Sequence, residues 1–141
     1  MRQLLLMRHA KSGYPPDVAA DFDRPLSRRG REDGPRMGRL LAAHGPRPDL
    51  IVCSPAQRAL QTAQAVADEL GGPGVPVRCE PQLYLAAVAT LEAVTSRLSP
   101  AVETCLVVGH NPGMEEWVRT LCGAQVRLPT AAIAAIELPL S

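Results

Sequence analysis

Aromatic side chains are scarce in this sequence, at 3% of its 141 residues, so Leu, Val, Ile and Ala must fill the core. An excess of one charge is also missing, because 15 Lys and Arg nearly balance 14 Asp and Glu, for a net charge of +1. This balance gives no general attraction to nucleic acid or to an anionic membrane surface. Any attraction for an anion must therefore be local.

Long apolar runs and paired cysteines are missing too. No run approaches the roughly 18 apolar residues of a membrane span, and Leu4 to Met7 is too short for a signal peptide. The cysteines contain no Cys-x-x-Cys pair, so we expect neither a disulfide framework nor a zinc site. They stand at Cys53, Cys79, Cys105 and Cys122. We expect a cytoplasmic protein with one domain over residues 1–141.

Short apolar runs alternate with longer helical patterns along the chain. The runs predict strands over residues 3–7, 50–53, 75–79, 104–108 and 132–138. Helices are predicted over residues 27–43, 55–70 and 88–98, and again after Asn111. Continuous apolar runs indicate strands that are buried on both faces. The sequence therefore predicts a three-layer α/β fold, with a mostly parallel central sheet flanked by helices.

Three local patterns mark where these helices begin. Ser54 to Gln57 resembles a capping box, with Pro55 at the first helical position. Asn111-Pro112 predicts a helix start in the same way. Ser27 is the expected cap of the first helix, but Gly34-Pro35 interrupts its pattern, so we expect a kink or a late start there.

Polar residues follow three of the predicted strands. The first strand leads into Arg8-His9, the second into Ser54 to Arg58, and the fourth into Gly109 to Asn111. Parallel strands end at one edge of a sheet, where open α/β folds bind their ligands. Two helix N-termini would point to the same place with unpaired N–H groups. Guanidinium groups clamp phosphoryl oxygens, and an imidazole can attack phosphorus, so this edge predicts a phosphoryl site.

Taken singly, these residues have plainer explanations. An Arg-His pair after a strand is usually a solvated loop start, and Arg58 alone would be an exposed residue in a first helical turn. His110 alone could be a loop histidine without a function. The functional interpretation depends on all three strand ends carrying groups that suit phosphate.

The order of these motifs resembles the histidine phosphatase superfamily, which includes the cofactor-dependent phosphoglycerate mutases. The resemblance rests on Arg8-His9-Ala10, on Ser54 to Ala63 and on Gly109-His110-Asn111-Pro112. Asp23 to Ser27 and Pro129 to Ile133 resemble more narrowly the SixA-type phosphohistidine phosphatases. The resemblance implies a compact phosphoglycerate mutase-like fold without a large cap insertion. It also implies that His9 is the nucleophile and that Arg8, Arg58 and His110 hold the phosphoryl oxygens.

By this resemblance the reaction needs no metal and no cofactor. The sequence departs from larger relatives because Ala10 replaces a common glycine and no acid follows Leu83, where they place their proton donor. The general acid stays unassigned. Its candidates are Glu80, Asp21 and Asp23, for each of which a solvated surface acid is the simpler interpretation. Lys11 and Ser12 are either further phosphate contacts or plain loop residues.

Three functions remain open from the sequence. The first is a phosphatase that acts on phosphohistidine in a protein, such as a histidine phosphotransfer domain. The second is a phosphatase for a small phosphomonoester. The third is a module that binds phosphoproteins without catalysis, against which the complete set of Arg8, His9, Arg58 and His110 argues. We expect a monomer with no nucleic-acid or membrane partner.

Overall fold

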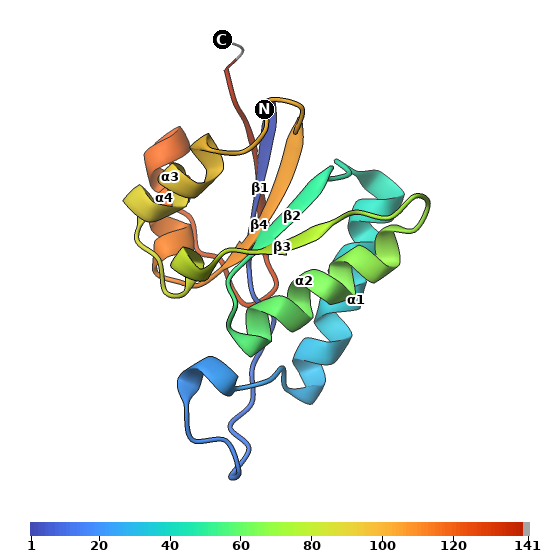
Figure 1. Ribbon diagram of the computed structural model, residues 1–141, viewed down its shortest axis with the longest axis vertical. Coiled ribbons are helices and arrows are strands. Elements are labelled where there is room, and N and C mark those ends of the chain that lie inside the picture. Colours follow the sequence, from blue (N-terminus) through green and yellow to red (C-terminus); the bar gives the residue numbers. More distant parts are fainter. Residues whose placement is uncertain (140–141) are drawn as a thin grey trace.

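The computed structural model describes residues 1–139 and has helices on both sides of a twisted sheet (Figure 1). Nearly every predicted element is present, and the α/β fold class is confirmed. The elements are β1 (Gln3–Arg8), η1 (Asp21–Asp23), α1 (Arg28–His44), β2 (Leu50–Cys53), α2 (Gln57–Leu70), β3 (Val77–Cys79), η2 (Pro81–Leu83), α3 (Val88–Ser96), β4 (Thr104–Gly109), α4 (Gly113–Cys122) and β5 (Ile133–Glu137).

The sheet has the strand order β3-β2-β4-β1-β5. Strands β1 to β4 run parallel, and β5 pairs antiparallel with β1 at one edge. The three strands that lead into the polar motifs, β1, β2 and β4, are therefore adjacent and end on the same side. This is the arrangement that the sequence predicted for the three motifs.

The sheet separates two apolar cores, because successive side chains of a strand point to opposite faces. Leu5 and Met7 of β1 pack with residues of α1 and α2, while Leu4 and Leu6 pack with residues of α3 and α4. Trp117 of α4 is fully buried in the second core. Figure 1 shows the helix pairs on either side of the sheet, which gives the three predicted layers.

Helix α1 corrects one prediction. It runs continuously from Arg28 to His44 through Gly34-Pro35, so the expected late start is wrong. The first turn is fixed by Ser27, whose Oγ accepts a hydrogen bond from the Gly30 N–H at 3.2 Å. Contacts with α2 stabilise the later turns: a Cβ on Gly34 would lie 3.2 Å from Ala65 Cβ. The glycine therefore serves close helix packing rather than a helix break.

Two other helices start later than predicted. Helix α2 begins at Gln57, and its cap residue Ala56 has no side-chain acceptor, so the predicted capping box is wrong. Helix α4 begins at Gly113, one residue after the predicted position. Asn111 still binds the first turn there, because its Oδ1 accepts from the Glu115 N–H at 3.2 Å.

The four cysteines carry no disulfide; Cys53 and Cys105 are buried, whereas Cys79 and Cys122 are exposed. Within residues 1–139, no helix has the length and apolar character that crossing a membrane requires.

Candidate active site

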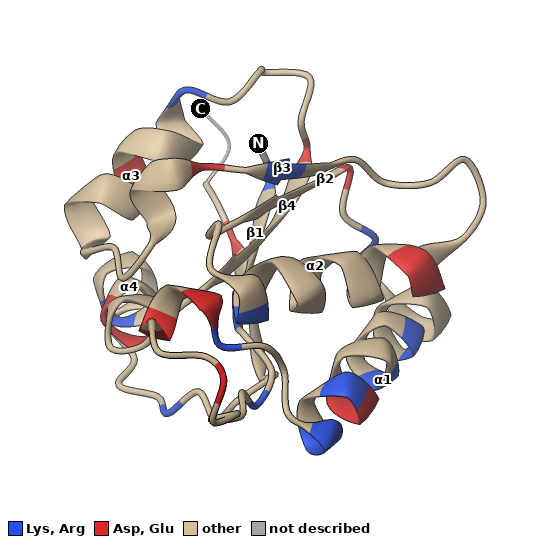
Figure 2. Cartoon of the chain, turned by 60° about the horizontal axis from the view of Figure 1, so that its bottom comes forward, with Lys and Arg blue, Asp and Glu red and all other residues tan. Residues whose placement is uncertain are grey.

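Three strand ends meet at the carboxyl edge of the sheet. The His9 N–H donates to the Gly109 oxygen at 3.0 Å, and the Ser54 N–H donates to the Val108 oxygen at 3.1 Å. The pairing of the strands thus continues into the polar residues. As a result, the ring centroids of His9 and His110 are 5.2 Å apart. Figure 2, which brings this edge forward, shows basic and acidic positions side by side around the start of α2.

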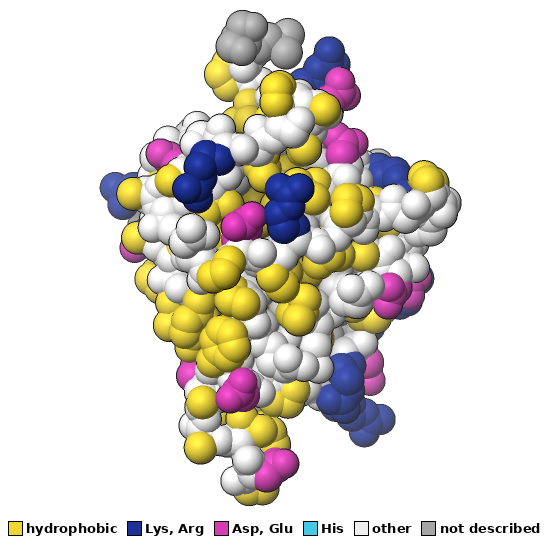
Figure 3. Space-filling view, viewed as in Figure 1, with side chains coloured by type: hydrophobic (Ala, Val, Ile, Leu, Met, Phe, Trp, Pro, Cys, Tyr) yellow, Lys and Arg dark blue, Asp and Glu magenta, His cyan; other side chains and the backbone are white. Residues whose placement is uncertain are grey.

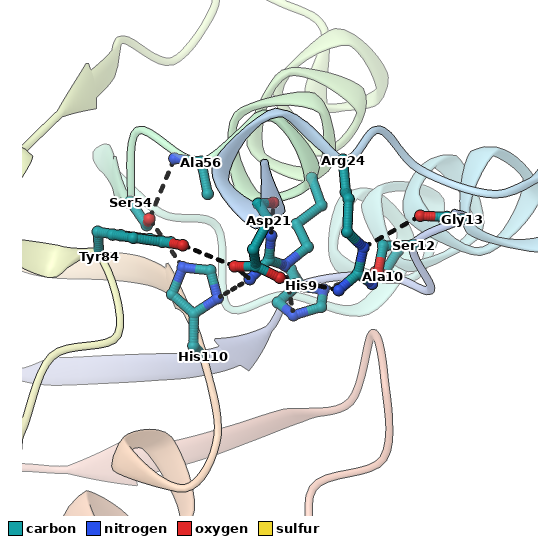
Figure 4. A network of polar contacts seen from close by, with 11 residues as sticks. His9, Ala10, Ser12, Gly13, Asp21, Arg24, Ser54, Ala56, Tyr84 and His110 are labelled. Carbon is teal, nitrogen blue, oxygen red and sulfur yellow. Dashed lines mark hydrogen bonds and ion pairs between the residues drawn. The ribbon is translucent and has the colours of Figure 1, made fainter. Parts of the chain in front are cut away.

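His9 is held in one tautomer by the backbone. Its Nδ1 lies 2.7 Å from the carbonyl oxygen of Ala10 (Figure 4), which can only accept, so Nδ1 carries the proton. Nε2 is therefore unprotonated and carries a lone pair. Ala10 is fixed in turn, because its N–H donates to the Thr62 Oγ1 at 3.0 Å. Position 10 thus holds an alanine without difficulty, although larger relatives have a glycine there.

The environment of His9 keeps the ring neutral. The pKa of His9 is lowered from 6.5 to about 4, mainly by burial, since a charged ring would lose its hydration. The positive charges of Arg58, Arg8 and Arg24 contribute to this lower pKa, and the Ala10 carbonyl opposes it. A neutral imidazole with an unprotonated Nε2 is the form that can act as a nucleophile at neutral pH.

Arg58 connects the two histidines. It lies in the first turn of α2 and is buried, not exposed as the simplest interpretation of the sequence held. Its Nε donates to His9 Nε2 at 3.3 Å, and its Nη2 lies 3.4 Å from His110 Nδ1. The late start of α2 leaves this guanidinium pointing across the strand ends. A guanidinium group is a set of donors that suits the oxygens of a phosphoryl group.

His110 is fixed by Ser54, the residue that the sequence pattern assigned to a helix cap. The His110 Nε2 and the Ser54 Oγ are 2.8 Å apart, and the Ser54 Oγ also accepts from the Ala56 N–H at 3.2 Å (Figure 4). Burial is the main reason why the pKa of His110 falls to about 3, with smaller effects from His9 and Arg58. Both histidines are thus neutral over the physiological range.

Arg8 lies at the same edge but makes a different contact. Its Nη1 donates to the carbonyl oxygen of Leu128 at 3.2 Å. Its buried Nε has no hydrogen-bond partner among the described residues. The charge of Arg8 lowers the pKa of both His9 and His110 slightly. A buried, unpaired guanidinium donor suits a bound oxyanion.

Asp21 and Tyr84 belong to this site, and the sequence analysis missed their role. Asp21 Oδ2 accepts from the Tyr84 hydroxyl at 2.6 Å and from Arg58 Nη2 at 3.0 Å (Figure 4), and its Oδ1 accepts from Arg24 Nη1 at 2.8 Å. Mainly through the Tyr84 hydrogen bond, its pKa falls to about 2. Asp21 is thus exposed, as the simpler interpretation held, but three side chains bind its carboxylate. The only sequence signal was its position three residues before Arg24.

The other candidate residues lie at the margin of this network of contacts, and Ser12 joins it through Arg24. Asp23 is exposed, and Glu80 is half-buried with its N–H bonded to the Cys53 oxygen. Lys11 is exposed, and Ser12 Oγ accepts from Arg24 Nη2. Over residues 1–139 we find no cluster of three or more His, Cys, Asp or Glu side chains placed to bind a metal ion.

The fold and this edge of the sheet define a phosphoglycerate mutase-like α/β protein. The family model of the histidine phosphatase superfamily (branch 1) matches residues 4–84. The chain belongs to the histidine phosphatase superfamily.

Comparison with known proteins gives both sequence and structural relatives. An uncharacterised chloroplastic protein of Arabidopsis thaliana is 32% identical over 96% of this chain and 66% of its own length. An uncharacterised protein of Mycobacterium tuberculosis is 43% identical over 75% of this chain and 63% of its own length. This chain thus spans about two-thirds of the length of these two curated relatives.

The SixA phosphatases are similar as well. Phosphohistidine phosphatase SixA of Escherichia coli is 29% identical over 96% of this chain and 85% of its own length. A solved structure of protein histidine phosphatase SixA with tungstate has a TM-score of 0.82 at 29% identity, covering 94% of this chain and 86% of that chain.

Proposed function

We propose that this chain is a phosphatase that transfers phosphoryl groups to His9 and then to water, with phosphohistidine in a protein as its substrate. The observation that carries the proposal is the state of His9. Its Nδ1 is bonded to the Ala10 carbonyl at 2.7 Å, its pKa is about 4, and its Nε2 faces the Arg58 guanidinium. A neutral nucleophile thus lies next to a fixed cation.

In the first step, the His9 Nε2 lone pair attacks phosphorus while the bond to the departing imidazole breaks. Positive charge develops on the His9 ring, and the Ala10 carbonyl stabilises it through the Nδ1–H. Arg8, Arg58 and His110 hold the phosphoryl oxygens. In the second step, water attacks phosphorus, the P–Nε2 bond breaks, its electron pair returns to Nε2, and inorganic phosphate leaves.

Asp21 supports the choice of phosphohistidine over a phosphomonoester. Among residues 1–139 it is the only carboxylate that contacts His9, Arg58 or His110, and with a pKa of about 2 it is ionised at neutral pH. It therefore has no proton to give to a leaving alkoxide. A departing imidazole needs no such donor, because its other ring nitrogen can already be protonated.

A substrate panel tests this proposal. Wild-type protein and His9→Ala are assayed with a protein phosphorylated on histidine, with aryl phosphates and with sugar phosphates. We expect wild-type turnover of phosphohistidine, slower turnover of aryl phosphates with acidic phenols, and none for His9→Ala. Turnover of sugar phosphates alone would replace the proposal by a phosphomonoesterase function. Binding of the phosphoprotein without turnover would replace it by a binding function.

The proposal carries further predictions. They are one catalytic domain over residues 1–141, a cytoplasmic location, a monomeric state, a reaction without metal, and a histidine phosphotransfer domain as partner.

A further inference from the structure

The few aromatic side chains of this chain are unevenly placed. The sequence has one Trp, two Tyr and one Phe, and only Trp117 lies in the core. Tyr14 is 80% exposed and Phe22 is 38% exposed, and Tyr84 is half-buried beside the site. In a protein with so little aromatic surface to bury, leaving such residues in solvent gives up the stabilisation that their burial would provide. Their common location points to a role in binding.

These rings adjoin the catalytic residues. The Phe22 ring meets the Tyr84 ring edge-on at 5.1 Å, and the Tyr84 ring meets the His110 ring edge-on at 5.6 Å. Arg24, which pairs with Asp21, lies 3.8 Å from the centre of the Tyr14 ring. The aromatic surface is therefore continuous with the proposed phosphoryl site.

Leu85, the residue after Tyr84, adds a further exposed apolar side chain. Its side chain is 57% exposed, and its backbone has a φ of 50°, a left-handed conformation that branched side chains rarely adopt. A groove of about 290 Å³ runs from Leu85 past Ala87 to Pro112, two residues after His110. In Figure 3, hydrophobic side chains gather over the segment between η2 and α3 and again on the loop below it.

We propose that Tyr14, Phe22 and Leu85 form a docking rim for the protein that presents the phosphohistidine, an inference that rests on the proposed function. The rim adjoins the strand ends that carry His9 and His110, so a protein bound to it would hold its phosphohistidine close to His9. Its residues come from two segments that are far apart in the sequence, and such a spread-out rim suits an apolar protein surface rather than a small metabolite.

Two exposed carboxylates near the rim indicate the charge of the partner's surface. Asp17 and Asp23 lie on the loop that carries Tyr14 and Phe22, and both are exposed. Neither has an ion pair among the described residues. Basic side chains around the apolar patch of the partner would complement these carboxylates.

The test compares two substrates in each variant: the phosphohistidine protein and free phosphohistidine, which cannot reach the rim. The measured quantity is the kcat/KM on the protein divided by the kcat/KM on the amino acid. We expect this ratio to fall about tenfold in Leu85→Ser and in Tyr14→Ser, as for a leucine or tyrosine lost from an interface. Leu40→Ser, a control on α1 that is 48% exposed, should keep the wild-type ratio.

A further variant tests the charge. At low ionic strength Asp17→Asn should have a lower ratio than the wild type. At high ionic strength this difference should disappear, because salt screens the attraction in the wild type. Thermal melting shows that each variant is folded. If the wild type hydrolyses the phosphohistidine protein but Leu85→Ser and Tyr14→Ser keep its ratio, the docking rim is wrong and the phosphatase function stands. If the wild type hydrolyses only phosphomonoesters, the proposed substrate itself fails.

Discussion

The carboxylate of Asp21 fixes the guanidinium of Arg58. Asp21 Oδ2 accepts a hydrogen bond from Arg58 Nη2 at 3.0 Å, and the backbone oxygen of Asp21 accepts one from Arg58 Nη1 at 2.8 Å. Two of the donor groups of Arg58 are therefore set by a loop residue 37 positions away. The remaining Nε lies against His9. Asp21 thus acts as a positioning residue for the proposed reaction.

Replacing Asp21 by Asn tests this role. The amide retains an acceptor but removes the charge, so Arg58 should be held less firmly and kcat on an aryl phosphate should fall about tenfold. The acidic limb of the pH profile should not move, because Asp21 donates no proton in this account. Asp68→Asn on α2 is the matched control and should keep the wild-type kcat. An unchanged kcat in Asp21→Asn would remove Asp21 from the mechanism.

The low histidine pKa values predict how activity depends on pH. His9 must be neutral to attack, and its pKa is about 4. Above about pH 5 the ring is almost fully neutral, so kcat/KM should no longer change with the protonation of His9. A profile that instead rises through pH 6.5 would show that His9 titrates like a solvated histidine. The measurement is kcat/KM from pH 3.5 to pH 8, with a substrate that does not titrate in this range.

The same pKa values predict how stability depends on pH. Between about pH 4 and pH 6.5 the unfolded chain binds protons at His9 and His110, whereas the folded chain does not, so stability rises with pH in this window. Lowering the pH from 7 to 5 should cost about 1 to 2 kcal/mol per histidine. Urea unfolding of wild type and His110→Gln at pH 7 and pH 5 measures this loss of stability. A pH effect of equal size in both proteins would contradict the prediction.

Ser54 and Ser27 make a pair of test positions with opposite expectations. Ser54→Ala removes the contact to His110 Nε2 and should lower kcat at least tenfold while the protein stays folded. Ser27→Ala removes the cap of α1 and should cost about 1 kcal/mol of stability with kcat unchanged. Enzyme kinetics and denaturant unfolding on both variants separate the two roles. Equal activity in Ser54→Ala would show that His110 needs no orienting partner.

Packing of α1 on α2 predicts a large effect at a glycine. A Cβ on Gly38 would lie 2.8 Å from Glu69 Cβ and 3.0 Å from the Val66 backbone. Gly38→Ala should therefore lose about 1 to 3 kcal/mol despite the better helix propensity of alanine. Gly34→Ala, whose Cβ would meet only Ala65 at 3.2 Å, should lose less. Thermal melting measures both variants, and Gly38→Ala should have the lower melting temperature. The reverse order would show that these contact distances do not determine the stability of the α1–α2 packing.

The sequence predicts the sheet and its polar edge well because both depend on short-range patterns. Apolar runs mark β1, β2 and β4, and a parallel sheet brings the residues after them together. Ser54 shows where such reasoning ends. Its pattern fits a helix cap, but the hydroxyl contacts His110, 56 residues away in the sequence. A local pattern cannot show which of two partners the side chain takes.

Asp21 and Tyr84 show the same limit more strongly. Their hydrogen bond joins two loops that are 63 residues apart, and neither loop has a periodic pattern. Gly34-Pro35 misled the prediction in the other direction, because contacts with α2 and the cap at Ser27 compensate for poor helix propensity. The contacts that sequence reasoning missed are those formed only after the chain has folded.

Trapping the enzyme during turnover tests the central claim most directly. Protein that is quenched in alkali after mixing with a labelled phosphohistidine substrate should carry one phosphoryl group that acid removes, in the peptide that contains His9. His9→Ala should carry none and should have lost its activity. Label on another residue, or full turnover by His9→Ala, would contradict the account.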